Sequence, residues 1–109
     1  MTVNITGRHI KINEHTRSHI NGAISSFSKY QLEITTINVT LSEAKNAVNV
    51  EFDMHIAHAK PVIINQIDKD LDTAIDLGID RAEKALRRLH DRVISHGHES
   101  LKDIELVEA

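Results

Sequence analysis

Hydrophobic residues recur at steps of three and four between residues 70 and 94. This spacing is typical of one face of a long amphipathic helix. We expect this face to pack against the rest of the domain. The apolar positions are Leu71, Ala74, Ile75, Gly78, Ile79, Ala82, Leu86, Leu89 and Val93.

Two segments in the middle of the chain, 34–43 and 47–57, alternate between hydrophobic and polar residues. Strict alternation predicts strands with one buried and one solvated face. The connection at residues 44–46 has hairpin length, so the strands are expected to be antiparallel. The expected inward residues are Ile37, Val39, Leu41, Val48, Val50, Phe52, Met54 and Ile56.

Two further strands are expected outside this pair. Residues 2–8 alternate in character, with Val3 and Ile5 on one face and polar residues on the other. Gly7 is expected to end that strand. The other strand is expected to run from about Lys60 to Ile67. Pro61 lies at its start, a position where proline is tolerated.

A first helix is expected from about Asn13 to residue 30. Asn13 is a good N-cap, and Ile12 could pack as the outer half of a hydrophobic staple. Gly22 and several serines lower the intrinsic stability of the helix, so it should need packing against a sheet. Its expected buried residues are Ile20, Ala23, Ile24 and Phe27.

The resulting order is β-α-β-β-β-α. It predicts an α+β fold in two layers, a four-stranded sheet with both helices on one face. We expect residues 1–96 to form one domain and residues 97–109 to form a flexible, acidic C-terminal tail. No repeat, linker or second domain is visible in the 109 residues.

The chain has no cysteine and a net charge of −3. The N-terminal sequence lacks the pattern of a secretory signal, and no apolar run is long enough to span a membrane, so a cytoplasmic location is expected. Four of the acids lie after residue 96 with one lysine, so residues 1–96 carry equal numbers of acids and bases. The domain is therefore neutral, without the large basic excess of many RNA-binding domains.

The charges on the long helix are sorted around its axis. At about 100° per residue, four cations fall within about 80° of one another, beside the apolar face. The acids lie on the far side: Asp72, Asp76, Asp80 and Glu83. This geometry suits binding to a phosphate backbone, although the helix dipole alone would also favour early acids and late bases. The cations are Arg81, Lys84, Arg88 and Arg92.

Catalytic signatures are lacking in this sequence. It has no phosphate-binding glycine loop and no nucleophile elbow. His15 and His19 share a helix face, but no third metal ligand is evident among the eight histidines. We therefore expect no enzymatic activity, no metal, no cofactor and no small-molecule substrate. With so few aromatic residues, we expect no recognition by base stacking, and contacts with shape and phosphate fit the sequence better.

The order of several short motifs resembles the bacterial ribosome hibernation factors, in particular the protein Y (ribosome-associated inhibitor A) branch. These motifs are TVNIT at residues 2–6, then Ile12, Arg17, KYQ at 29–31 and DLDTAID at 70–76. The resemblance covers nearly the whole chain. It includes the acidic tail at residues 100–108, which the short hibernation-promoting factor lacks.

The resemblance implies a fold similar to a double-stranded-RNA-binding domain. It also implies binding to the 30S subunit and the 70S ribosome, on 16S rRNA in the channel between head and body. Family members there overlap the places of messenger RNA and of transfer RNA in the A and P sites, under stress or in stationary phase. Inhibition of translation is then steric.

The family's basic positions on the last helix match Arg81, Lys84, Arg88 and Arg92, and Arg87 adds another. On the first helix Arg17 and Lys29 match, and Arg8 and Lys11 are candidates to extend the contact. The chain departs from the family at three positions. Two bases are replaced by Ala23 and Ser26, and an early aromatic residue of the last helix is replaced by Asp72.

Two alternatives remain open. The chain could act as a hibernation-promoting factor that pairs ribosomes into inactive dimers, although the tail favours protein Y. It could instead be a protein-binding adaptor that uses the acidic face of the last helix or a sheet edge.

Overall fold

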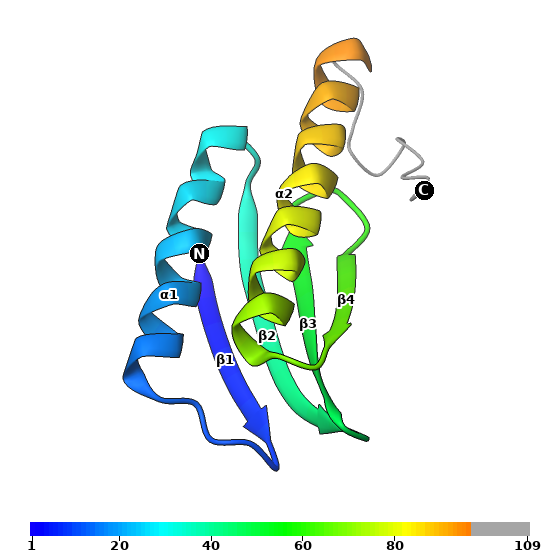
Figure 1. Cartoon of the computed structure of the whole chain (residues 1–109). Helices are drawn as coiled ribbons and strands as arrows, with labels where there is room; N and C mark the ends of the chain where they lie inside the picture. Colours follow the sequence, from blue (N-terminus) through cyan, green and yellow to red (C-terminus); the bar gives the residue numbers. More distant parts are fainter. Residues whose placement is uncertain (97–109) are drawn as a thin grey trace.

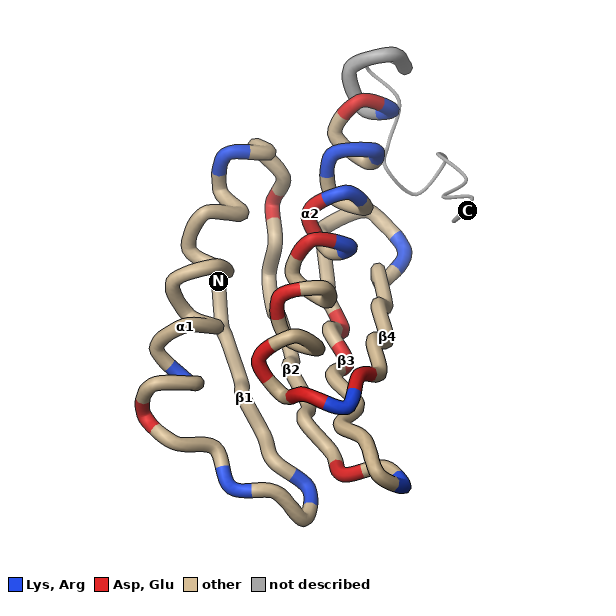
Figure 2. The backbone as a smooth tube through the Cα atoms, viewed as in Figure 1, with Lys and Arg blue, Asp and Glu red and all other residues tan. Residues whose placement is uncertain are grey.

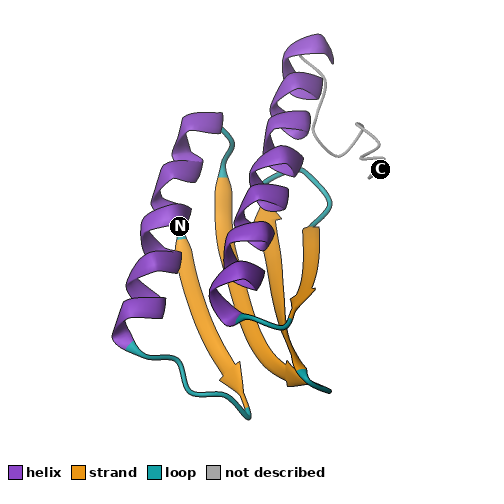
Figure 3. Cartoon of the chain, viewed as in Figure 1, coloured by secondary structure: helices purple, strands orange, loops and turns teal. Residues whose placement is uncertain are grey.

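The computed structural model describes residues 1–96, with side chains to residue 92. The expected tail at 97–109 lies outside the described residues. Two helices lie against a four-stranded sheet (Figures 1 and 3). The elements are β1 (Thr2–Arg8), α1 (Glu14–Ser25), the short 3₁₀ helix η1 (Ser26–Tyr30), β2 (Ile34–Ala44), β3 (Ala47–Ile56), β4 (Val62–Asp68) and α2 (Leu71–His96).

The sheet has the strand order β1-β2-β3-β4. β2, β3 and β4 form an antiparallel meander, and β1 pairs in parallel with β2. A parallel neighbour requires a crossover, which α1 supplies between β1 and β2. Both helices cover the same face of the sheet (Figure 1), so the predicted two-layer α+β fold is confirmed.

The core lies between this sheet face and the two helices. The predicted inward residues of β2 are buried, as are Ile20, Ile24 and Phe27. On α2 the buried stripe follows the predicted one and also includes Ala85. The predicted position Val93 lies outside the described side chains.

Several predicted boundaries differ from the structure by a few residues. β1 spans the predicted residues 2–8, but Gly7 does not end it, because residues 7 and 8 still pair with β2. β4 begins at Val62, so Pro61 lies in the connection before it. The first helix changes from α to 3₁₀ after Ser25, where serine hydroxyls donate to backbone carbonyls one turn earlier. The 3₁₀ turn still brings Phe27 and Tyr30 into the core.

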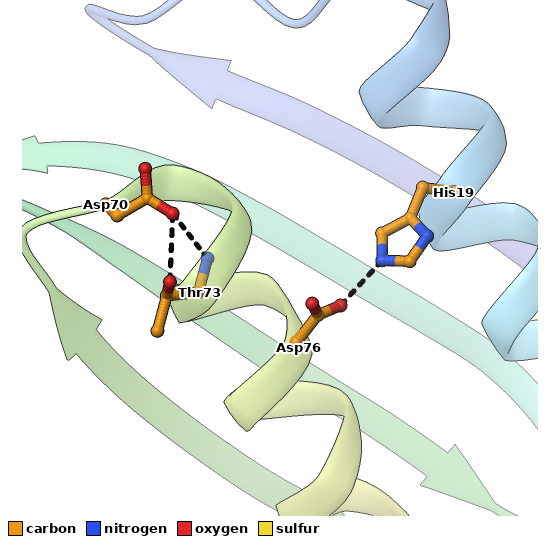
Figure 4. A network of polar contacts seen from close by, with 4 residues as sticks. All are labelled: His19, Asp70, Thr73 and Asp76. Atoms are coloured by element: carbon orange, nitrogen blue, oxygen red, sulfur yellow. Dashed lines mark hydrogen bonds and ion pairs between the residues drawn. The ribbon is translucent and has the colours of Figure 1, made fainter.

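Side-chain caps fix the first residues of both long helices. The side chain of Asn13 accepts a hydrogen bond from the Thr16 amide at 2.8 Å, which confirms the predicted cap. Asp70 precedes α2, and its Oδ2 accepts from both the amide and the hydroxyl of Thr73 at 2.9 Å (Figure 4). These two bonds lower the pKa of the Asp70 carboxyl below its ordinary value of 3.8, and the bond from the backbone amide has the larger effect. The cap was not predicted, although Asp is among the preferred capping residues.

Replacing Asp70 with Asn should remove a pH-dependent part of the stability. Because the folded-state pKa is lowered, the ionised carboxyl stabilises the fold above its unfolded pKa, and this stabilisation is lost as the pH falls through the folded pKa. Urea unfolding from about pH 2 to about pH 6 should show the wild type gaining stability over Asp70→Asn as the pH rises. A constant difference would contradict this. Asp70→Ala should be less stable than Asp70→Asn, because Asn still caps.

Two helical glycines should respond in opposite ways to alanine. A Cβ at Gly78 would lie 2.9 Å from Cε1 of Phe52, a ring buried in the core, so Gly78→Ala should destabilise the protein despite its better helix propensity. A Cβ at Gly22 meets nothing within 4 Å, so Gly22→Ala should stabilise by about 1 kcal/mol. Chemical unfolding of both variants tests this; stabilisation by both would show that α2 can move away from β3.

Candidate nucleic-acid interface

The cationic flank of α2 lies on the β4 side of the helix. The guanidinium of Arg81 donates to the carbonyl oxygen of Asn65 and, at 3.2 Å, to Oε1 of Gln66. Since residues three and four apart are neighbours on a helix, the other cations follow Arg81 along the same flank. We call these residues the cationic stripe: Arg81, Lys84, Arg88 and Arg92.

The acidic flank of α2 faces α1 and η1 instead. Asp76 Oδ1 lies 2.7 Å from Nε2 of His19 on α1 (Figure 4). Glu83 Oε2 lies 3.2 Å from Nζ of Lys29 on η1. Two acids of α2 thus meet bases of the neighbouring elements, while Arg81 is turned toward β4.

Members of the cationic stripe also interact within the protein. Lys84 lies 3.3 Å from the carboxylate of Asp80, one helical turn earlier, and both side chains are well exposed. Such an exposed pair contributes little stability, so Lys84 can exchange it for another anion at small cost. Arg88 and Arg92 likewise interact with other groups of the protein. Figure 2 shows the basic residues gathered along the second half of α2.

Arg87 and Lys29, both expected at the site, lie outside the stripe. Arg87 follows Glu83 by four residues and Lys84 by three, so it lies between the acidic flank and the cationic stripe. Lys29 pairs with Glu83 across α2, and its Nζ lies 5.3 Å from the ring centre of Tyr30. The Glu83 carboxylate, by hydrogen bond and then by charge, raises the pKa of Lys29. Lys29 thus contacts α2 from η1, through an ion pair in which Lys29 itself remains well exposed.

Arg8 and Lys11 lie at the far end of the molecule. Arg8 ends β1 and pairs with Ser42, close to the β2–β3 turn. α2 begins near that end, since β4 leads into it, and then runs toward the opposite end (Figure 1). The second half of α2 is therefore remote from Arg8 and Lys11. Arg17, half-buried on the first part of α1, also lies outside the stripe.

Lys60 was missed by sequence reasoning. It is exposed in the connection between β3 and β4. This connection lies at the end of the sheet toward which α2 runs (Figure 1). No periodicity marks a lysine in a short loop, and only the topology decides at which end of the sheet it lies.

The two positions where the family's bases are absent differ in environment. Ala23, predicted to be buried, is only half-buried. Ser26 is exposed, and its hydroxyl donates to the Ala23 carbonyl at 2.7 Å. The first helix therefore presents fewer cations than the family pattern implies.

The described residues give little support for metal binding, base stacking or membrane insertion. Among them, no group of three His, Asp or Glu side chains converges to hold a metal ion. All three aromatic residues, Phe27, Tyr30 and Phe52, are buried and cannot stack on bases. In residues 1–96 no helix is both long and apolar enough to cross a bilayer. The arrangement is best suited to contacting phosphates from one face of a rigid helix.

Comparison with known proteins finds relatives whose names agree with the resemblance seen in the sequence. The chain is 27% identical over 94 residues to the ribosome hibernation promoting factor of Azotobacter vinelandii, covering 86% of this chain and 87% of that protein. The N-terminal domain of Protein Y from Thermus thermophilus superposes with a TM-score of 0.72 at 27% identity, covering 81% of this chain and 98% of that domain.

A ribosomal subunit interface protein from Coxiella burnetii shares the fold, with a TM-score of 0.70 at 16% identity, over 81% of this chain and 96% of that one. The family model described as Sigma 54 modulation protein / S30EA ribosomal protein matches residues 3–94. These matches confirm the resemblance noted in the sequence. Because the matched residues span most of the chain, the protein belongs to the Sigma 54 modulation protein / S30EA ribosomal protein family.

Proposed function

We propose that this protein is a ribosome-associated inhibitor of translation, acting in the cytoplasm under stress or in stationary phase. It binds the 30S subunit, alone and in the 70S ribosome, on 16S rRNA near the A and P sites and the messenger RNA channel. The family match and the names of the relatives from Azotobacter and Thermus support ribosome binding. The proposed location on the 30S subunit rests on the match between the basic residues of this chain and the basic positions of the family.

The observation that carries the proposal is the cationic stripe on a helix held in place from both sides. Arg81 joins α2 to β4, while Asp76 and Glu83 join it to α1 and η1. Cations on a rigid element keep their spacing, so less entropy is lost when they meet a fixed array of phosphates. Contacts of this kind position a protein without reading base sequence.

Inhibition would require no chemistry on the protein. A domain lodged among the places of messenger RNA and transfer RNA excludes both by volume. The described residues carry no metal-binding cluster, and the sequence has no catalytic signature. We therefore propose a non-enzymatic, steric mechanism.

Two alternatives differ in what they predict. The Azotobacter relative's name favours a role in promoting hibernation, in which ribosomes pair into inactive dimers. An adaptor using the acidic flank of α2 is less favoured, because Asp76 and Glu83 already contact α1 and η1. Sucrose gradients of ribosomes with the full chain, or with a chain ending at residue 96, separate inhibition from dimerisation. More dimers with the shorter chain would show that residues 97–109 oppose pairing.

Changing the whole cationic stripe to alanine should abolish co-sedimentation with 30S and 70S particles. The variant carries Arg81→Ala, Lys84→Ala, Arg88→Ala and Arg92→Ala. Circular dichroism controls for folding, because Arg81 also bonds to β4. Full retention of binding by a folded variant would refute the role of the stripe, and RNase-resistant capture of a single protein would favour the adaptor.

A double variant, Lys84→Ala with Arg88→Ala, should weaken binding and flatten its dependence on salt. Each lost phosphate contact should reduce the slope of log K against log salt concentration by about 1, so the double variant should lose about 2. Ribosome pelleting from about 50 to about 200 mM salt measures both slopes.

Lys45→Ala with Lys69→Ala provides the matched control. It removes the same charge from the end of the molecule near the β2–β3 turn, where α2 begins. The control should bind nearly as the wild type and keep its salt slope. Equal losses in the two double variants would mean that net charge, and not the stripe, controls binding.

A further inference from the structure

One edge of the sheet carries exposed hydrophobic residues. β4 has β3 on one side only, so it is an edge strand. Edge strands present backbone groups without strand partners and usually avoid exposed apolar side chains. Ile63 and Ile67, both on β4, are 54% and 60% exposed. They point to the sheet face opposite the helices, because they alternate with the buried Val62 and Ile64.

The helix beside this edge carries another exposed hydrophobic residue, on the opposite side of the sheet from the two isoleucines. Leu77 on α2 is 41% exposed and precedes Arg81 by four residues, so it lies at the start of the cationic stripe. The bond from Arg81 to the Asn65 carbonyl places this stripe along β4. Among the described residues, Ile63, Ile67 and Leu77 are the exposed large hydrophobic residues other than Met1. We call this combined surface the β4 edge: Ile63, Ile67, Leu77, Arg81 and Lys84.

The sequence beyond α2 is complementary to the β4 edge. Residues 103–107 read Asp-Ile-Glu-Leu-Val, in which acidic and hydrophobic residues alternate. An extended segment beside an edge strand directs successive side chains to opposite sheet faces. Ile104 and Leu106 would then face the side of the isoleucines. Asp103, Glu105 and Val107 would face the helix.

The spacing of these side chains matches that of α2. Leu77 and Arg81 are about 6 Å apart along the helix axis, at 1.5 Å per residue. Val107 and Glu105 are about 7 Å apart in an extended chain, at 3.3 Å per residue. With Val107 beside Leu77, Glu105 reaches Arg81, and Asp103 lies about 7 Å further on, near the next cations of the stripe.

The connection is long enough for this arrangement. Six residues lie between His96 and Asp103, and the seven steps from one to the other can span about 23 Å. The return from the end of α2 to the level of Arg88 is about 12 Å along the helix. The segment would arrive from the Arg88 end, so Asp103 meets the stripe before Val107 does, in agreement with the spacing.

We propose that residues Asp103–Val107 dock on the β4 edge of their own chain. The carboxylates of Asp103 and Glu105 pair with the cationic stripe, and the hydrophobic side chains cover Leu77 and the two isoleucines. Arg81 can donate to the Glu105 carboxylate while it remains bonded to the Asn65 carbonyl, because a guanidinium has five N–H donors. The segment then competes with phosphates for the same cations, so it lowers the affinity for RNA until it is displaced. Only this last consequence rests on the proposed function.

A spin label tests the docking in the full-length chain. The protein has no cysteine, so Ala109→Cys allows a single nitroxide label just beyond the docking segment. In ¹⁵N spectra at low salt, the amides of Ile63–Ile67 and Leu77–Lys84 should broaden most, and those of β1, at the other sheet edge, much less. Equal broadening of β1 and β4, or none, would overturn the proposal. Broadening of unlabelled ¹⁵N protein mixed with labelled ¹⁴N protein would also overturn it, since the contact would then join two copies.

Two tail variants complete the test. Asp103→Lys with Glu105→Lys should remove the selective broadening, and its persistence would count against pairing with the stripe. Ile104→Ser with Leu106→Ser leaves the charge unchanged and should bind ribosomes several-fold more tightly than the wild type. Unchanged affinity, with ribosomes still bound, would refute the competition. If no form binds ribosomes while the broadening remains, the docking stands and the proposed function fails.

Discussion

The packing of α2 on β3 and β4 is the contact on which the rest of the structure depends. Gly78 allows the helix to approach the buried ring of Phe52, since a Cβ there would come within 2.9 Å of the ring. This close approach fixes the depth of the helix in the core. The buried stripe fixes its rotation, and rotation in turn decides which charges face β4 and which face α1.

Rotation also explains why the acids and the bases of α2 have different roles. The acidic flank is used within the protein, where Asp76 and Glu83 contact His19 and Lys29. The basic flank lies at the β4 side, where Arg81 bonds to the edge strand. A neutral domain can thus present local positive charge, because its acids are placed against the bases of another element.

The first helix makes a smaller contribution to this surface than the family pattern implies. Ala23 and Ser26 stand where bases are expected, and Lys29 is paired with Glu83. What α1 and η1 supply instead is support, through buried Ile20, Ile24 and Phe27 and through the two ion pairs to α2. In the proposed function, α2 therefore supplies most of the contacts with phosphate.

The sequence by itself determined the elements, the two-layer architecture and the sorting of charge on the last helix. Periodicity reports which side of each element is buried, and that information is local. Only the tertiary structure decided which neighbour each flank meets. It separated Arg8, Lys11 and Lys29 from the stripe and paired β1 in parallel with β2. These outcomes depend on contacts between residues far apart in the chain, which no local pattern encodes.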